Sequence, residues 1–177
     1  MNKSYHFINR SIHQNNKMDD FRTPKYLFSF IENKFGPIHY DGACTPSLNN
    51  LAPPLKLENK WPSNCTIYSN PPFDSVSIIK WINKGHEHTK NGGTHILLLP
   101  NKLCQVFFNE LFPMIDHIIY FGGRVDFSSP YSCKGGSSMS GSILLIQYPP
   151  SAKPKHIKIE NFLLRDLKKT YKEGFNE

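Results

Sequence analysis

Residues 70–73, with the sequence Asn-Pro-Pro-Phe, could hold and orient a planar amino group. They directly follow a short apolar run that has the composition of a buried strand. The side-chain oxygen of Asn70 and the carbonyl oxygen of Pro71 can each accept one N–H bond from such an amine. Those two bonds favour a pyramidal nitrogen whose lone pair is localised for attack on an electrophile. Pro71 and Pro72 would keep the acceptors rigid, and Phe73 offers a face for stacking a flat ring.

The same four residues also fit a purely structural role. A Pro-Pro pair can simply close a strand, and the aromatic residue after it can pack in a core. The tetrapeptide alone therefore leaves both interpretations open, and the elements around it must decide between them.

Further motifs occur in order along the chain, two before the tetrapeptide and the others after it. They are Asp20-Phe21-x-Thr23-Pro24, a strand-like segment ending in Asp41 with small residues and Asn49 behind it, Trp81, Leu-Leu-Pro at 98–100, Gly-Arg-Val-Asp-Phe at 123–127, and an apolar run at 142–146. In this order they resemble the phage-type, Dam-like DNA N6-adenine methyltransferases, over residues 19–148. The resemblance implies an α/β fold, a Rossmann-like class I methyltransferase sheet with helices on both faces, compact and lacking some peripheral strands.

The resemblance also implies an S-adenosylmethionine-dependent enzyme that methylates adenine N6 in DNA. The base would be flipped out of the duplex or lie in a single strand. The residues that it implies as catalytic are Asn70, Pro71, Pro72 and Phe73, with Phe73 stacking on the base. Arg124, in the Gly-Arg motif, would contact the DNA phosphates, and a structural ion pair is the alternative role for this residue.

Asp41 is the first candidate for cofactor contact, because ligands of α/β sheets bind outside the carboxyl ends of strands. A turn-capping role for Asp41 is the alternative. The resemblance adds Thr23, Pro24 and Ala43 as pocket neighbours. Only about twenty residues separate this loop from the catalytic strand, an interval that in a full methyltransferase fold carries two further strands. Glu58 is the acidic residue available there for the cofactor ribose, unless the interval is a bare loop.

Composition predicts one globular domain with a polyanionic partner. A chain of 177 residues with a net charge of +7 can bury a substantial core and gain affinity from phosphate contacts. Four widely spaced cysteines predict free thiols and no zinc site. His86 and His88 are expected at the surface, so no metal is predicted. The compact chain leaves little room for a separate recognition domain, so we expect modest sequence specificity or a partner that supplies it; the oligomeric state stays open.

No apolar run reaches the roughly 18 residues of a membrane helix, so we expect no membrane partner. The expected location is intracellular, in the cytoplasm or in the compartment that holds viral or phage DNA. Three divisions are expected: a polar extension at 1–18, a methyltransferase domain at 19–150, and a C-terminal amphipathic helix packed on that domain at 151–177.

Hydrophobic periodicity and turn residues predict the elements in more detail. They are a helix at 24–34 capped by Thr23 and stopped by Gly36, strands at 38–41 and 66–69, a helix at 75–84 with Val76, Ile79 and Ile82 inward and Gly85 beyond its end, a strand at 94–99, a helix at 103–112, strands at 118–121 and 143–147, and a helix at 159–172.

Three other functions remain open at this point. The same chemistry on RNA, including the cap-adjacent adenosine, is the nearest, because Asn-Pro-Pro-Phe also appears in RNA adenine methyltransferases. A similar loop serves enzymes that methylate protein glutamine. A catalytically inactive nucleic-acid-binding module of the same fold is the third.

Overall fold

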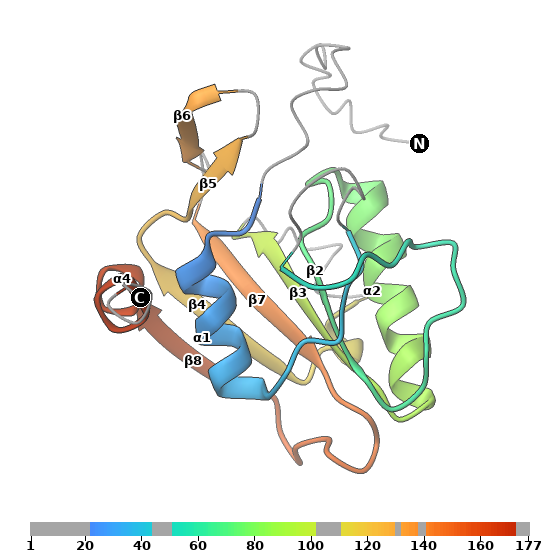
Figure 1. Ribbon diagram of the computed structural model, residues 1–177. Helices are drawn as coiled ribbons and strands as arrows, with labels where there is room; N and C mark the ends of the chain where they lie inside the picture. The colour runs from blue at the N-terminus through green and yellow to red at the C-terminus, as the bar shows by residue number, and fades with distance from the viewer. Residues whose placement is uncertain (1–21, 44–50, 102–110, 130–131, 138–140, 173–177) are drawn as a thin grey trace, which may run out of the picture.

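The computed structural model describes residues 22–43, 51–101, 111–129, 132–137 and 141–172. One six-stranded sheet with helices on both faces forms the body of the molecule (Figure 1). A small two-stranded sheet projects from it. The α/β architecture expected from the sequence is therefore confirmed.

The six strands lie in an order that differs from their order in the sequence. Across the sheet they are β1 (Tyr40–Asp41), β2 (Thr66–Ser69), β3 (Thr94–Pro100), β7 (Ser142–Gln147), β4 (His117–Gly122) and β8 (Lys158–Leu163). β7 is antiparallel to both of its neighbours, whereas the other neighbouring pairs are parallel. The antiparallel direction of the strand predicted at 143–147 is thus confirmed.

The carboxyl ends of five strands meet at one edge of the sheet as a result. β1, β2 and β3 run in one direction. β4 runs in the same direction, because β7 lies between β3 and β4 and is antiparallel to both. β8 is parallel to β4 and so shares this direction. We call this the carboxyl edge. It is the edge at which ligands of open α/β sheets bind.

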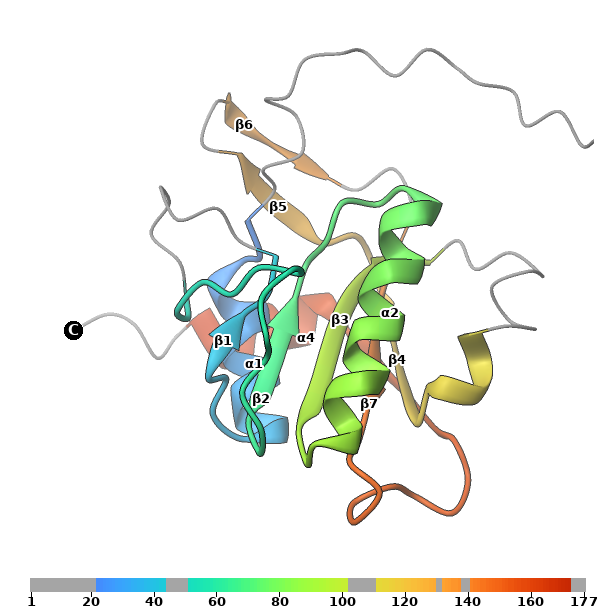
Figure 2. The ribbon, with the colours of Figure 1, turned by 90° about the vertical axis from the view of Figure 1, so that its right-hand side faces the viewer.

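Two apolar cores lie on the two faces of the sheet. α1 (Lys25–Phe35) and α4 (Leu164–Lys172) cover one face, and α2 (Ser75–Lys90) covers the other, as the turned view shows (Figure 2). Along β3 the side chains of Ile96 and Leu98 pack on the first face, and Leu97 and Leu99 pack on the second. The strand is continuously apolar because both of its faces are buried.

α1 ends where the sequence predicts, but it begins differently. Gly36 adopts a left-handed φ of 86° at the helix end, a conformation that costs glycine little. The predicted cap by Thr23 is wrong: Pro24 occupies the N-cap position, and no side chain caps the helix. The Thr23 hydroxyl instead bonds to Tyr68 Oη on β2.

α2 is longer than predicted and buries a different face. It continues through Gly85 to Lys90, and its buried residues are Trp81, Ile82, Gly85, His88 and Thr89. The inward placement of Val76 and Ile79 is wrong, because their side chains are 61% and 38% exposed. Gly85 does not end the helix because it packs directly on the sheet. His88, expected at the surface, is buried, and its Nε2 lies 3.0 Å from the Cys65 carbonyl.

The C-terminal helix predicted at 159–172 is wrong for its first part. Residues 158–163 form β8, which pairs with β4, and the helix α4 starts only at Leu164. The unsatisfied edge of β4 is a stronger partner for these residues than a helical turn. α4 then packs on α1, where Phe30 contacts Phe162 and Tyr171 at centroid distances of 4.9 and 6.0 Å.

The remaining predictions concern connecting segments. Residues 51–65 contain no strand, only a bridge between Pro54 and Asp41. The helix predicted at 103–112 lies almost wholly outside the described residues; Phe112–Met114 form a 3-10 turn, η1. β5 (Asp126–Ser129) and β6 (Ser132–Ser137) form the projecting hairpin. Within the described ranges, no helix has the length and apolar character needed to cross a membrane.

Candidate active site

The loop at 70–73 leaves the carboxyl edge directly after β2. Asn70 is half-buried, Pro71 is buried, and Pro72 and Phe73 are exposed, so the loop passes from the core to the surface within four residues. Its far end is fixed by Asp74, whose side chain accepts a 2.8 Å bond from the Ser77 N–H and caps α2. Asp74 is therefore the N-cap of the helix that follows the loop.

Phe73 presents its ring beside the projecting hairpin. The side chain is 39% exposed, and its ring lies 6.2 Å from that of Phe127 on β5, at an interplanar angle of 69°. Phe127 itself is buried. The packing of one ring edge against β5 leaves part of Phe73 open to a ligand at the carboxyl edge.

Asp41 ends β1, next to the end of β2. Its partner across the parallel ladder is Tyr68, two residues before Asn70. The N–H of Ala43 donates a 3.1 Å bond to Asp41 Oδ1. Burial raises the pKa of Asp41 to about 6, although the Ala43 bond acts in the opposite direction. The site thus contains a carboxyl group whose charge changes close to neutral pH.

The loop after β1 packs on the end of β2, the strand that leads into residues 70–73. Gly42 N–H donates a 2.7 Å bond to the Tyr68 carbonyl oxygen. A Cβ atom on Gly42 would lie 2.6 Å from Ser69 Oγ and 2.9 Å from the Trp81 ring, so only glycine fits this approach. The segment assigned to the cofactor therefore packs on the end of β2, directly before the segment assigned to the target.

Thr23 and Pro24 lie against the same strand ends. Thr23 Oγ1 is 2.6 Å from Tyr68 Oη, and Tyr68 is fully buried. Burial raises the pKa of Tyr68, as does the nearby Asp41, while the Thr23 bond lowers it. Thr23 and Asp41 thus both lie near the side chain of Tyr68.

Glu58 lies beyond the segment that runs along β1. Residues 53–55 run along β1, with Asp41 N–H bonded to the Pro53 carbonyl and Leu55 N–H bonded to the Asp41 carbonyl. Glu58 follows in an exposed turn, with its carboxylate 4.0 Å from Lys56 Nζ. No contact in the described part of the chain joins it to Asp41.

Arg124 lies in the turn from β4 to β5 at the same edge. The preceding Gly123 has a φ of 114°, which a residue with a side chain rarely adopts, so the turn depends on this glycine. Arg124 is exposed. The structure therefore places a cation at the base of the hairpin that carries Phe127.

Three buried polar residues near the loop were not singled out by the sequence analysis. Ser69, His95 and Gln147 form a hydrogen-bonded chain under it. The signal for His95 was its position as a polar residue inside the apolar run of β3. Among the described residues, no group of histidine, cysteine or carboxylate side chains could hold a metal ion.

A comparison with protein families matches residues 10–170 to the family described as DNA N-6-adenine-methyltransferase (Dam). The match covers nearly the whole chain, including every candidate site residue. A comparison with curated proteins finds no match.

Proposed function

Because this chain belongs to the Dam family of DNA N-6-adenine-methyltransferases, we propose that residues 70–73 hold its target adenine and that the loop after β1 holds its methyl donor. The protein is a DNA adenine-N6 methyltransferase, and its family implies S-adenosylmethionine as the donor. The observation that carries the proposal is the packing of Gly42 on the end of β2 at the carboxyl edge, where residues 70–73 begin.

The residues at the end of β1 fit such a donor. S-adenosylmethionine supplies a methyl group made electrophilic by a positively charged sulfonium, and it also carries an ammonium group. The Asp41 carboxylate, oriented by the Ala43 N–H, provides a complementary negative charge at this position. Thr23 and Pro24 would line the pocket beside it, since the Thr23 hydroxyl is held by Tyr68. Glu58, on its exposed turn, remains the candidate for the ribose hydroxyls.

Asn70 and the Pro71 carbonyl would orient the adenine amine. The lone pair of this nitrogen is delocalised into the ring, so the amine is a poor nucleophile. Two acceptors on its hydrogens would localise the pair and direct it toward the methyl group. Pro71 and Pro72 restrict the backbone of the loop, and the Asp74 cap fixes its far end. The residues therefore act by orientation, which alone can change rates by orders of magnitude.

The target base must leave the duplex to reach this loop. A base inside the helix cannot present its amine to a pocket at a sheet edge, so we propose a flipped-out or single-stranded adenine. The exposed part of the Phe73 ring would stack on it, while Phe127 supports the other side of that ring.

Arg124 would contact a DNA phosphate next to the base. It is exposed at the carboxyl edge, at the base of the hairpin. Removing one phosphate contact lowers the slope of log affinity against log salt by about one. We expect Arg124→Ala to show this change in DNA titrations at several salt concentrations, and an unchanged slope would exclude the contact.

The division of the chain at residue 150 stays a proposal. Residues 19–150 and the C-terminal segment at 151–177 would fold together as one unit, preceded by the extension at 1–18. Since β8 completes the sheet of that unit, we expect a chain cut after residue 150 to lose the cooperative unfolding of the full chain.

The experiment that tests the function is methyl transfer from labelled S-adenosylmethionine to duplex DNA, single-stranded DNA and RNA, with mass spectrometry of the nucleosides. We expect N6-methyladenine in DNA. Asn70→Ala should lower its rate about 100-fold or more, because it removes an acceptor used in the transition state. Asn83→Ala, which removes an exposed amide from α2, is the matched control and should keep the wild-type rate. Methylation of RNA alone, or equal rates for the two variants, would contradict the proposal.

A further inference from the structure

A buried hydrogen-bonded chain lies directly beneath the catalytic loop. Ser69 Oγ is 3.0 Å from His95 Nε2, and His95 Nδ1 is 3.1 Å from Gln147 Oε1. All three side chains are completely inaccessible to solvent. We call these three residues the buried anchor. They come from β2, β3 and β7, three adjacent strands of the sheet.

The positions of the protons in the buried anchor follow from the hydrogen bonds that Gln147 makes. Gln147 Nε2 donates to two carbonyl oxygens, those of Ile82 at 3.1 Å and Met114 at 3.2 Å. Carbonyls only accept, so the Gln147 oxygen must be the atom that faces His95. His95 therefore carries its proton on Nδ1, and its Nε2 accepts the proton of the Ser69 hydroxyl. Burial lowers the pKa of His95 to about 3, so the ring stays neutral.

The catalytic loop begins at this anchor, and the helix that follows the loop packs on it. Ser69 is the residue immediately before Asn70. Beyond the loop, α2 is held by the bond from Gln147 to the Ile82 carbonyl. α2 also lies on the anchor through Gly85, where a Cβ atom would be 1.9 Å from His95 Nδ1. The start of the loop and the helix after it are thus both held by the same buried group.

The loop after β1 rests on the same group. The hydroxyl oxygen of Ser69 is the nearest atom to the position of a Cβ on Gly42, at 2.6 Å. Gly42 stands between Asp41 and Ala43, the residues proposed to hold the methyl donor. Ser69 therefore contacts the loop that would hold the donor, and it directly precedes the loop that would hold the target amine.

We propose that Ser69, His95 and Gln147 are positioning residues that fix the separation between the methyl donor and the target amine; this inference rests on the function proposed above. The Ser69 hydroxyl, directed by its bond to His95, sets how closely the Gly42 loop approaches Asn70. None of the three contacts substrate. They act through the backbone of the two loops.

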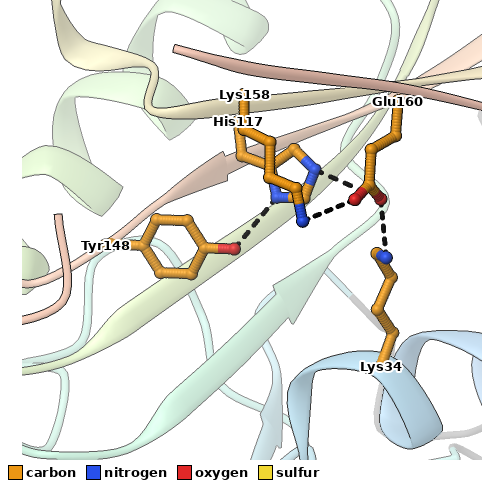
Figure 3. A network of polar contacts seen from close by, with 5 residues as sticks. All are labelled: Lys34, His117, Tyr148, Lys158 and Glu160. Carbon is orange, nitrogen blue, oxygen red and sulfur yellow. Dashed lines mark hydrogen bonds and ion pairs between the residues drawn. The ribbon is translucent and has the colours of Figure 1, made fainter. Parts of the chain in front are cut away.

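The first test compares two variants that each remove one hydroxyl bonded to a histidine. Ser69→Ala removes the bond to His95 beneath the loop. Tyr148→Phe removes the 3.0 Å bond between Tyr148 Oη and His117 Nδ1 at the opposite edge of the sheet, in the network shown in Figure 3. Because both variants lose the same kind of bond, a merely structural role predicts the same effect on activity.

We expect Ser69→Ala to lower kcat about tenfold or more, since a small misplacement of reacting groups costs this much. Its KM for DNA and its Kd for S-adenosylmethionine should stay within about twofold of wild type, because neither molecule touches the anchor. Tyr148→Phe should leave kcat unchanged. Equal kcat values in the two variants would overturn the proposal. If Ser69→Ala does not fold, Gly42→Ala tests the same contact from the other side, with the same loss of kcat expected.

A second readout does not depend on activity. The side-chain amide of Asn70 should give one sharp pair of NMR signals in the wild-type protein and in Tyr148→Phe. In Ser69→Ala these signals should broaden or double, because the loop is no longer held in one position. If the wild-type enzyme transfers no methyl group to adenine, the proposed function fails. Unchanged Asn70 signals in Ser69→Ala would instead refute the positioning role.

Discussion

At the scale of single residues, Asp41 combines a stability cost with a chemical role. Its pKa in the folded protein, about 6, lies above the ordinary value of 3.8. The folded state therefore binds the proton more tightly than the unfolded state. The associated stability is complete below about pH 4 and is lost as the pH rises through 6.

Asp41→Asn should consequently stabilise the protein at pH 7.5, by about 2 kcal/mol if a shift of two pKa units is counted at 1.36 kcal/mol each with some solvent screening. The gain should disappear by about pH 4. Urea unfolding at several pH values measures it. The control is Glu87→Gln on the exposed side of α2, which should change stability by less than about 0.5 kcal/mol. A gain that does not depend on pH would contradict the assignment.

The same carboxyl group should control cofactor affinity. Its ionised form attracts a cationic donor, so the affinity for S-adenosylmethionine should weaken as the pH falls through about 6. In Asp41→Asn the affinity should be lower and nearly independent of pH in this range. Calorimetric titration at pH 5 and pH 7.5 distinguishes the two cases, and a strong pH dependence in the variant would exclude Asp41 as the responsible group.

Phe73 allows a matched test of base stacking. Phe73→Ala should raise KM for single-stranded DNA about tenfold, since stacking contributes roughly 1–3 kcal/mol per base. Phe73→Tyr should keep the wild-type value because the ring remains. Val76→Ala, three residues later in the chain and 61% exposed, is the control for a general loss of exposed apolar surface. An equal rise of KM in Phe73→Ala and Val76→Ala would argue against stacking.

At the scale of elements, α2 depends on its single glycine. An exposed glycine in a helix is normally improved by alanine, by up to about 1 kcal/mol. Gly85 is the exception because a methyl group there would overlap the buried side chains of His95 and Gln147. We expect Gly85→Ala to destabilise the protein by about 1–3 kcal/mol, measured by thermal unfolding. Asn83→Ala, two residues earlier and exposed, should be neutral or slightly stabilising.

The start of α2 could be predicted from the local sequence, whereas its end could not. Local patterns correctly predicted a helix start near residue 75, because the Asp74 cap is a local signal. They placed its end at Gly85 because a glycine after an amphipathic stretch usually stops a helix. The contact that keeps Gly85 helical comes from β3 and β7, which are distant in sequence. No local pattern encodes that contact.

The same distinction explains the other outcomes. The strands near 66–69, 94–99, 118–121 and 143–147 were predictable because they are apolar on both faces. β8 was not, since at the sheet edge its exposed Ile159 and Leu163 imitate the spacing of a helix. For the site, motif order identified the loops at 41–43 and 70–73. The three buried polar residues beneath them were missed because the polar position of His95 in β3 does not by itself reveal its partners on β2 and β7.

At the scale of the whole molecule, an ion-pair network on β8, at the other end of the sheet from β1, makes the stability of the protein decrease in acid. Glu160 lies between Lys34 Nζ at 2.6 Å and Lys158 Nζ at 2.5 Å, as Figure 3 shows. Burial by itself would raise the pKa of Glu160, but these two ammonium groups outweigh it and lower the pKa to about 2. This network joins α1, β4 and β8, and so links the first helix to the last strand.

The stability from Glu160 is therefore present above pH 4.5 and lost as the pH falls toward 2. Glu160→Gln should cost about 1–2 kcal/mol at pH 7, a discounted value because Lys158 is more than half exposed. The difference should vanish near pH 2. Asp166→Asn, in an exposed ion pair with Arg165, is the control and should cost less than about 1 kcal/mol. Urea unfolding between pH 2.5 and 7 checks both, and a pH-independent cost would contradict the network.

The packing of α1 against α4 has a consequence for synthesis on the ribosome. Phe30 leaves the ribosome early, yet its aromatic partners include Phe121, Phe162 and Tyr171. At about 5–20 residues per second, the last of these follows it by roughly 7 to 28 seconds. During this interval Phe30 lacks its aromatic partner from the last helix. Chaperones can therefore bind the unfinished chain during this interval. A translational pause before β8 should prolong that association.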